Sequence, residues 1–162
     1  MLIRRIVSGG QSGADRAALD AAIGLGVEYG GWCPAGGWAE DLPDPPGLLA
    51  AYPGLRETPS ADPAQRTEWN VRDSDATLIL VPAGVTSPGT LLTEALAKRM
   101  GRPLLRLDPS DRDAVAAVIG FVQGDSTGTR LNVAGPRESE ASGLHAAARL
   151  LLEDALRPIA DS

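Results

Sequence analysis

A glycine-rich turn near the start of the chain has the composition of an anion-binding site. It follows an apolar run at residues 3–7 and leads into a helical pattern. Glycines allow a tight turn and let backbone N–H groups approach a ligand, while a helix N-terminus adds roughly half a positive charge. The residues concerned are Ser8, Gly9, Gly10, Gln11, Ser12, Gly13 and Asp15. They predict a phosphate site, and the alternative is a plain strand-to-helix connection capped by Asp15.

The spacing within this turn narrows the choice of ligand. The turn has neither the G-x-G-x-x-G spacing of dinucleotide sites nor the Walker lysine, so it does not indicate NAD binding or an ATPase. Because loops tolerate substitution better than cores, we expect Gly10→Asp to leave the fold mostly intact. The same substitution is expected to abolish anion binding by steric block and charge.

A second loop offers hydroxyls and backbone N–H groups ahead of another expected helix. It follows the apolar run at residues 77–81 and contains Ser87, Pro88, Gly89 and Thr90. Glu94 lies about one turn into that helix, where its carboxylate would either contact a ligand or favour the helix dipole. Two helix N-termini would then converge on one anionic ligand.

A polar stripe marks the helix expected after Asp62. Arg66, Trp69, Asn70 and Asp73 recur at i, i+3, i+4 and i+7, so they share one helix face. A core-facing helix would carry aliphatic residues at these positions. The stripe therefore either receives a flat polar ligand or is a solvated face held by side-chain pairs.

Four carboxylates, from Asp15, Glu40, Asp41 and Glu94, complicate a pure phosphate site, because like charges near a dianion cost energy. A purine or pterin edge with adjacent N–H groups, or ribose hydroxyls, would supply the donors that a carboxylate accepts well. Surface charge is the preferred interpretation of Glu40 and of Asp41 taken singly.

Classical catalytic and metal-binding sets are not expected in this chain. Cys33, the only cysteine, has no neighbouring His or Cys and is typical of a small buried hydrophobe. His145, the only histidine, lies far along the sequence from every glycine loop. We find no Ser/His/Asp set and no structural zinc spacing, so we predict no catalytic residues of these kinds and no protein-bound metal.

The elements that must position these residues form an α/β pattern. Five apolar runs, at residues 3–7, 26–29, 77–81, 103–107 and 130–134, are expected strands, and most precede a helical pattern. This is typical of a parallel sheet covered by helices on both faces. We expect a doubly wound, five-stranded sheet in the order 2-1-3-4-5. Ligands bind such a sheet where the strand order reverses, which selects the loops after the first and third strands.

The segment at residues 30–63 is rich in glycine and proline and shows no sustained period, yet it carries Trp32, Trp38 and Tyr52. A long loop in a compact fold is usually functional or disordered. We interpret it either as a lid over the ligand or as an irregular covering of the sheet.

Length and composition set the remaining bounds. A chain of 162 residues with 43% hydrophobic composition suffices for one domain, spanning residues 1–162. The net charge of −6 opposes binding to nucleic acid or acidic membranes, so the expected partner is a small-molecule ligand captured locally. With one cysteine, no apolar run of about 20 residues and no long apolar region at its start, the chain is expected to be cytoplasmic.

Several of these segments together resemble the family of molybdenum cofactor carrier proteins. They are residues 6–20, 30–34, 39–41, 66–75 and 132–137, in order along nearly the whole chain. The resemblance implies a Rossmann-like fold, homo-oligomers, and binding of molybdenum cofactor for storage, protection or transfer without turnover. A carrier is thus favoured over an enzyme, and a molybdoenzyme or a cofactor-synthesis donor is the implied protein partner. The expected cofactor contacts include Trp32, Arg66, Trp69 and Asn70 beside the two glycine loops.

Two alternatives stay open. The loop Pro88, Gly89 and Thr90 is similar to that of the lysine-decarboxylase-like, lonely-guy phosphoribohydrolases, whose pattern P-G-G-x-G-T-x-x-E ends in a glutamate. Here Thr93 stands at that place and Glu94 follows one residue later. Hydrolysis of a nucleoside 5′-monophosphate, with Glu94 as acid or base, is therefore the second hypothesis. A nucleotide-sensing module without turnover is the third.

Overall fold

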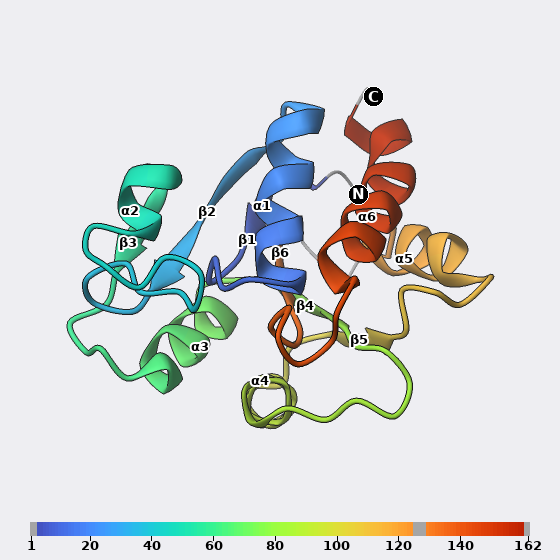
Figure 1. Ribbon diagram of the computed structural model, residues 1–162. Helices are drawn as coiled ribbons and strands as arrows, with labels where there is room; N and C mark the ends of the chain where they lie inside the picture. Colours follow the sequence, from blue (N-terminus) through green and yellow to red (C-terminus); the bar gives the residue numbers. More distant parts are fainter. Residues whose placement is uncertain (1–2, 125–128, 161–162) are drawn as a thin grey trace.

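A parallel β-sheet forms the centre of the molecule, which is described here from a computed structural model covering residues 3–124 and 129–160 (Figure 1). Six strands lie in the order β3-β2-β1-β6-β4-β5. The strands are β1 (Arg5–Val7), β2 (Glu28–Cys33), β3 (Leu55–Glu57), β4 (Ala76–Leu80), β5 (Leu104–Leu107) and β6 (Arg130–Ala134). The helices are α1 (Ala14–Leu25), α2 (Leu48–Ala51), α3 (Pro63–Arg72), α4 (Pro88–Arg99), α5 (Ala114–Val122) and α6 (Leu144–Ala160).

The expected α/β class and parallel sheet are confirmed, but the strand number and order are not. The sheet has six strands because the segment at residues 30–63 contributes β3, which pairs with the end of β2. This strand is only three residues long and two of its residues are exposed, so it has neither the length nor the alternation that identifies a strand in a sequence. The same segment also contains α2, and it is therefore not a long structureless loop.

The last strand, β6, lies between β1 and β4, so the expected order 2-1-3-4-5 is wrong. Burial explains its place. Leu131 and Val133 are fully buried in the main core, whereas Arg106 of β5 is exposed, as suits a strand at the edge. The chain consequently brings three loops to the carboxyl end of the sheet centre: those after β1, β4 and β6.

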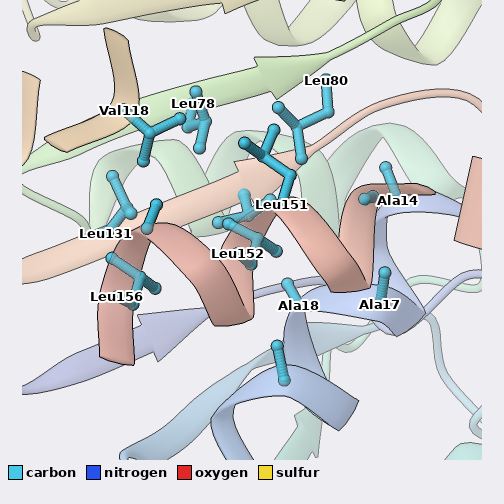
Figure 2. Packing of buried hydrophobic residues seen from close by; sticks show 14 of the residues in the cluster. Ala14, Ala17, Ala18, Leu78, Leu80, Val118, Leu131, Leu151, Leu152 and Leu156 are labelled. Carbon is cyan, nitrogen blue, oxygen red and sulfur yellow. The ribbon is translucent and has the colours of Figure 1, made fainter. Parts of the chain in front are cut away.

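The main core lies on the face of the sheet covered by α1, α5 and α6. Alanines on α1 let this helix approach α6 closely, and the two helices run side by side (Figure 1). Figure 2 shows Leu151 and Leu152 of α6 near Ala18 of α1 and the sheet residue Leu131. The apolar stripe of α6 repeats at helical spacing in the sequence and is buried here; it consists of Leu144, Ala148, Leu151, Leu152 and Ala155. None of the described helices has the length and apolar character needed to cross a membrane.

The opposite face carries α3 and α4, which pack on β2 and on β4 with β5 respectively. A second, smaller core holds the 30–63 segment on the protein and consists of Leu19, Cys33, Ala39, Leu48 and Leu55. Tyr52, one of the aromatics that drew attention to this segment, donates its hydroxyl to Asp20 of α1 at 2.6 Å. The segment is thus an ordered covering.

Truncation of a buried α6 leucine tests this packing. Leu152 is 1% exposed, so Leu152→Ala should lower the free energy of unfolding by about 2–5 kcal/mol through lost burial and a new cavity. Leu150, on the same helix but 61% exposed, is the matched control, and Leu150→Ala should change stability by less than about 0.5 kcal/mol. Urea unfolding of both variants measures the difference. Equal losses would contradict the assignment of these two faces.

Candidate functional site

A cleft opens at the carboxyl end of the central strands, between the loops after β1, β4 and β6. Its inner part has a volume of about 40 Å³ and reaches Thr93 of α4 and Asn132 of β6. Its outer part, of about 280 Å³, reaches Trp38, Arg137 and Glu140 at the rim. Both parts are lined by Asp15, Arg66, Gly89 and Gly135, so they form one continuous site.

A buried ion pair stands where the two parts of the cleft meet. The Arg66 Nη1 atom lies 3.5 Å from the Asp15 Oδ2 atom, and the two side chains are 12% and 10% exposed. Arg66 also donates from Nη1 to the carbonyl oxygen of Gly9 at 3.0 Å. A Cβ at Gly9 would collide with this guanidinium, so the glycine makes room for Arg66.

Burial dominates the titration of Asp15. It raises the pKa of this carboxyl group to about 6, although Arg66, a backbone hydrogen bond from Gln11 and Arg16 all act in the opposite direction. The cleft therefore contains one carboxyl group that changes its charge near neutral pH.

Hydrogen bonds among its own residues stabilise the turn after β1. The Ser8 hydroxyl donates to the Asp15 carbonyl oxygen at 2.8 Å, and the Gly10 N–H donates to the Ser8 hydroxyl at 3.2 Å. The Gln11 side-chain oxygen accepts from the N–H groups of Ser12 and Glu40. The Gln11 amide nitrogen has no partner among the described residues, and Gln11 lines the outer cleft. Of these side chains, only Gln11 therefore offers the cleft a free donor.

The N-terminus of α1 is covered by the loop after β6. The Ala14 N–H donates to the Pro136 carbonyl oxygen at 3.3 Å, and a Cβ at Gly13 would collide with that oxygen. The Ser12 hydroxyl accepts from the Glu138 N–H at 3.1 Å. The helix start expected to bind phosphate is thus in contact with protein.

Ser12 and Gly13 line a different hollow, on the far side of the turn, together with His145. The expectation that His145 lies far from every glycine loop is therefore wrong, because folding brings His145 beside the glycine turn. Its Nε2 atom lies 2.7 Å from the Asp20 Oδ2 atom. The Arg16 guanidinium donates to both carboxylate oxygens of Asp41 at 2.8 Å. The first contact joins α6 to α1, and the second holds the 30–63 segment on α1.

The N-terminus of α4 faces the cleft and is open. Ser87 caps this helix by accepting from the Thr90 N–H at 3.1 Å, and the Thr90 and Ser87 hydroxyls bond each other at 2.8 Å. Gly89 lines both parts of the cleft, and a Cβ there would meet no atom within 4 Å. Within the described chain the Gly89 N–H has no partner. An anion would find this helix start accessible.

The polar stripe of α3 mostly serves to hold the helix on β2. The Asn70 side chain accepts from the Trp32 N–H at 2.8 Å and donates to the Trp32 carbonyl oxygen at 3.0 Å. The Trp32 indole donates to Asp73 at 2.8 Å and packs edge-on against Trp69 with ring centroids 4.8 Å apart. Asn70 reaches the cleft wall with its amide oxygen and nitrogen each bonded to the Trp32 backbone, and Arg66 is the stripe residue with an ion pair inside the cleft.

Eight of the expected contact residues line the cleft: Gly9, Gln11, Asp15, Arg66, Asn70, Ser87, Pro88 and Gly89. Ser8, Gly10, Trp32, Trp69, Thr90 and Glu94 line neither part of it. Glu94 instead pairs with Lys98 at 3.2 Å and with Arg106 at 2.8 Å, and these hydrogen bonds lower its pKa. Glu94 therefore has no place in the cleft.

Sequence reasoning missed several lining residues. Asn132 was hidden inside an apolar strand pattern, and its polar character within that strand was the available signal. Trp38 was noticed only as one aromatic of the 30–63 segment, yet it stands at the rim with 36% exposure. Arg137, in the loop after β6, also lines the outer cleft.

The only cysteine of the sequence lies away from the cleft. Cys33 is fully buried in the smaller core, where burial raises the pKa of its thiol to about 11. Over residues 3–124 and 129–160, no group of three His, Cys, Asp or Glu side chains is arranged to hold a metal ion.

Comparison with known proteins identifies the family. The model of the circularly permutated YpsA SLOG family matches residues 6–156. The chain belongs to this SLOG family. A crystal structure titled "Putative molybdenum carrier protein", from Syntrophus aciditrophicus, is 40% identical, with a TM-score of 0.82 over 96% of both chains. This match confirms the resemblance to molybdenum carriers seen in the sequence. No functionally curated protein matches the chain.

The geometry of Gly10 reverses one expectation for this SLOG protein. Gly10 has a φ of 76°, and a Cβ there would lie 2.9 Å from Leu55 and 3.1 Å from Leu48, in the smaller core. Gly10→Asp should therefore destabilise the fold by about 3 kcal/mol or more, because it strains the backbone and buries a charge. Gly89→Ala, whose Cβ meets open space, is the control. Thermal unfolding at one pH compares them, and a Gly10→Asp variant as stable as the control would refute this account.

Asp15 should make the stability of the SLOG protein depend on pH. Its folded-state pKa of about 6 lies above the ordinary 3.8, so the folded state binds more protons between these values and stability falls as pH rises through this window. The full loss is on the order of 3 kcal/mol. Asp15→Asn should accordingly be more stable than wild type at pH 7.5, with the advantage vanishing below pH 4. The exposed Asp44→Asn is the control in urea titrations, and no pH-dependent difference for Asp15→Asn would count against the shift.

Proposed function

We propose that the cleft binds a phosphorylated, flat heterocycle, and that molybdenum cofactor is the ligand, held for storage, protection or transfer without turnover. The observation that carries this proposal is the buried Arg66–Asp15 pair, which has an open helix start beside it and an aromatic rim outside it. The molybdenum carrier title of the 40%-identical structure supports the choice of cofactor.

The phosphate would take the α4 side of the cleft. Gly89 offers a free N–H at the start of a helix of 12 residues, whose dipole favours an anion there. Arg66 and Arg137 line the adjoining wall, and guanidinium groups bind phosphate through paired hydrogen bonds. The Ser8 to Gly13 turn would contribute the Gln11 amide, since the start of α1 already contacts Pro136.

The ring system of the ligand would lie in the outer cleft. Trp38, Pro63 and Pro88 give this part flat apolar surfaces, against which a heterocycle packs well. Asp15 faces the same space, and its carboxylate can accept two hydrogen bonds from the adjacent N–H groups of a pterin edge. The cleft thus offers hydrogen-bond donors for the phosphate of the cofactor and a carboxylate acceptor for its pterin ring.

The metal of the cofactor needs no ligand from the protein in this arrangement, because the dithiolene sulfurs of the cofactor hold it. Cys33, the one thiol, lies in the smaller core and does not line the cleft. Assembly into homo-oligomers, and exchange with a molybdoenzyme or a cofactor-synthesis donor, belong to the same proposal.

Hydrolysis of a nucleoside 5′-monophosphate is the second candidate, and one observation favours it. A carboxyl group with a pKa of about 6, such as that of Asp15, can donate a proton near neutral pH. The glutamate on which the sequence comparison relied does not help, since Glu94 pairs with Lys98 and Arg106 outside the cleft. Asp15 is the acid that this alternative requires.

Binding experiments with cleft variants test the proposal. Purified protein is incubated with molybdenum cofactor and, separately, with AMP, and binding, cofactor lifetime and release of adenine are followed. Arg66→Gln and Trp38→Ala should each weaken cofactor binding about tenfold, through lost charged hydrogen bonds and lost ring contact. They should also shorten the lifetime of the added cofactor. Glu94→Gln is the matched control and should bind as wild type does.

Each outcome decides between the candidates. Release of adenine at catalytic rates, abolished in Asp15→Asn, would establish the hydrolase and overturn the carrier. Saturable binding of neither compound would reject the cleft as their site. Equal weakening by Arg66→Gln and Glu94→Gln would show that binding lies elsewhere on the protein.

A further inference from the structure

Three arginines from three strands line a groove away from the cleft. Arg5 begins β1, Arg56 lies in β3 and Arg130 begins β6, and together they border a hollow of about 220 Å³. Trp32 and Asp73 complete its wall, so the groove lies on the sheet face that α3 covers. Arg66 and Gly89, which define the cleft, do not line this groove.

Two of these arginines are direct neighbours in the sheet. Arg5 and Arg130 are register partners in adjacent parallel strands, which places their Cα atoms about 5 Å apart. Like charges opposite each other in neighbouring strands are destabilising. Arg130 is neutralised by Asp75, with Nη2 and Oδ1 3.0 Å apart. Within residues 3–124 and 129–160, Arg5 has an ion pair only with the exposed Glu28, at 3.7 Å. The groove therefore retains uncompensated positive charge.

The Arg5 side chain is directed across the sheet toward Arg56. A Cβ at Gly30 of β2 would collide with the Arg5 guanidinium, so Arg5 lies over β2 at a position without a side chain. β3, which carries Arg56, is the next strand beyond β2. The Arg56 side chain is exposed and has neither a hydrogen bond nor an ion pair with any other described residue. Two guanidinium groups thus flank the groove with their donors largely unused.

The acidic group in the groove, Asp73, offsets only part of the charge of the three arginines. Asp73 accepts from the Trp32 indole at 2.8 Å and from Arg72 at 2.8 and 3.0 Å, and these bonds lower its pKa. Its carboxylate is therefore already engaged. A local excess of arginine stands out on a chain whose net charge is −6.

We propose that this groove is a second anion site, separate from the cleft, and that it binds a compact multivalent oxyanion such as a diphosphate group. Guanidinium groups bind phosphate oxygens through paired hydrogen bonds. Strands β3 and β6 are three steps apart in the sheet, roughly 14 Å, and this span favours two linked oxyanion groups over a single one. Bound anion would also offset the repulsion between Arg5 and Arg130.

Titration with inorganic pyrophosphate by calorimetry, at low ionic strength and without divalent cations, tests the site. Arg5→Gln and Arg56→Gln should each weaken binding about tenfold, the usual effect of removing a charged hydrogen bond. The control is Arg149→Gln on α6, where Arg149 pairs with Glu153 at 2.7 Å. It removes the same charge elsewhere and should change binding less than twofold. Arg66→Gln is measured beside it to detect any pyrophosphate bound in the cleft.

Each result bears on the groove itself. Because the Arg56 side chain has no hydrogen-bond or ion-pair partner in the described chain, Arg56→Gln should keep the wild-type melting temperature. Arg56→Gln therefore still tests the site if Arg5→Gln unfolds. Absence of saturable pyrophosphate binding by wild type would overturn the proposal. So would an equal loss in Arg66→Gln, which would assign the anion to the cleft. Unchanged pyrophosphate binding in Arg56→Gln with a loss of self-association in sedimentation would identify the groove as a contact between copies, and would equally overturn it.

Discussion

The insertion of β6 between β1 and β4 is the constraint on which the site depends. It brings the loop that follows β6 to the carboxyl end of the sheet, beside the loops after β1 and β4. That loop then covers the start of α1, where the Pro136 carbonyl oxygen accepts the Ala14 N–H. The start of α4 stays open in consequence, and Gly89 becomes the accessible helix terminus. With β6 between β1 and β4, the start of α1 is thus covered by protein, and the start of α4 is the one accessible to an anion.

Helix α3 divides the opposite face of the sheet into two polar sites. Asn70 fixes this helix on β2, because its amide oxygen accepts from the Trp32 N–H and its amide nitrogen donates to the Trp32 carbonyl oxygen. On one side of this contact Arg66 enters the cleft, and on the other Asp73 and Trp32 border the arginine groove. The centre of the α3 stripe therefore holds the helix on β2, and its two ends border the cleft and the arginine groove.

Local electrostatics outweigh the net charge of this protein. The chain carries a charge of −6, yet arginines gather at the cleft and at the groove. In the cleft, burial raises the pKa of Asp15 to about 6, and the Arg66 guanidinium 3.5 Å away offsets the charge of its carboxylate. Asp73 is likewise occupied by Arg72 and the Trp32 indole. Nearby arginine side chains therefore attract an anion at short range, while the net negative charge of the protein opposes its approach.

Short-range patterns in the sequence determined the local elements and the chemistry of the glycine turn. The run at residues 130–134 matches β6, and the stripe with Leu151 and Leu152 matches the buried face of α6, because alternation and helical period depend on neighbouring residues. The family resemblance was also readable from the motifs. Strand order, the closure of the α1 start and the loss of Glu94 from the site were decided only in the tertiary structure. Each depends on which distant segment packs against which, as when Leu131 enters the core or Arg106 reaches Glu94, and no local pattern encodes such pairings.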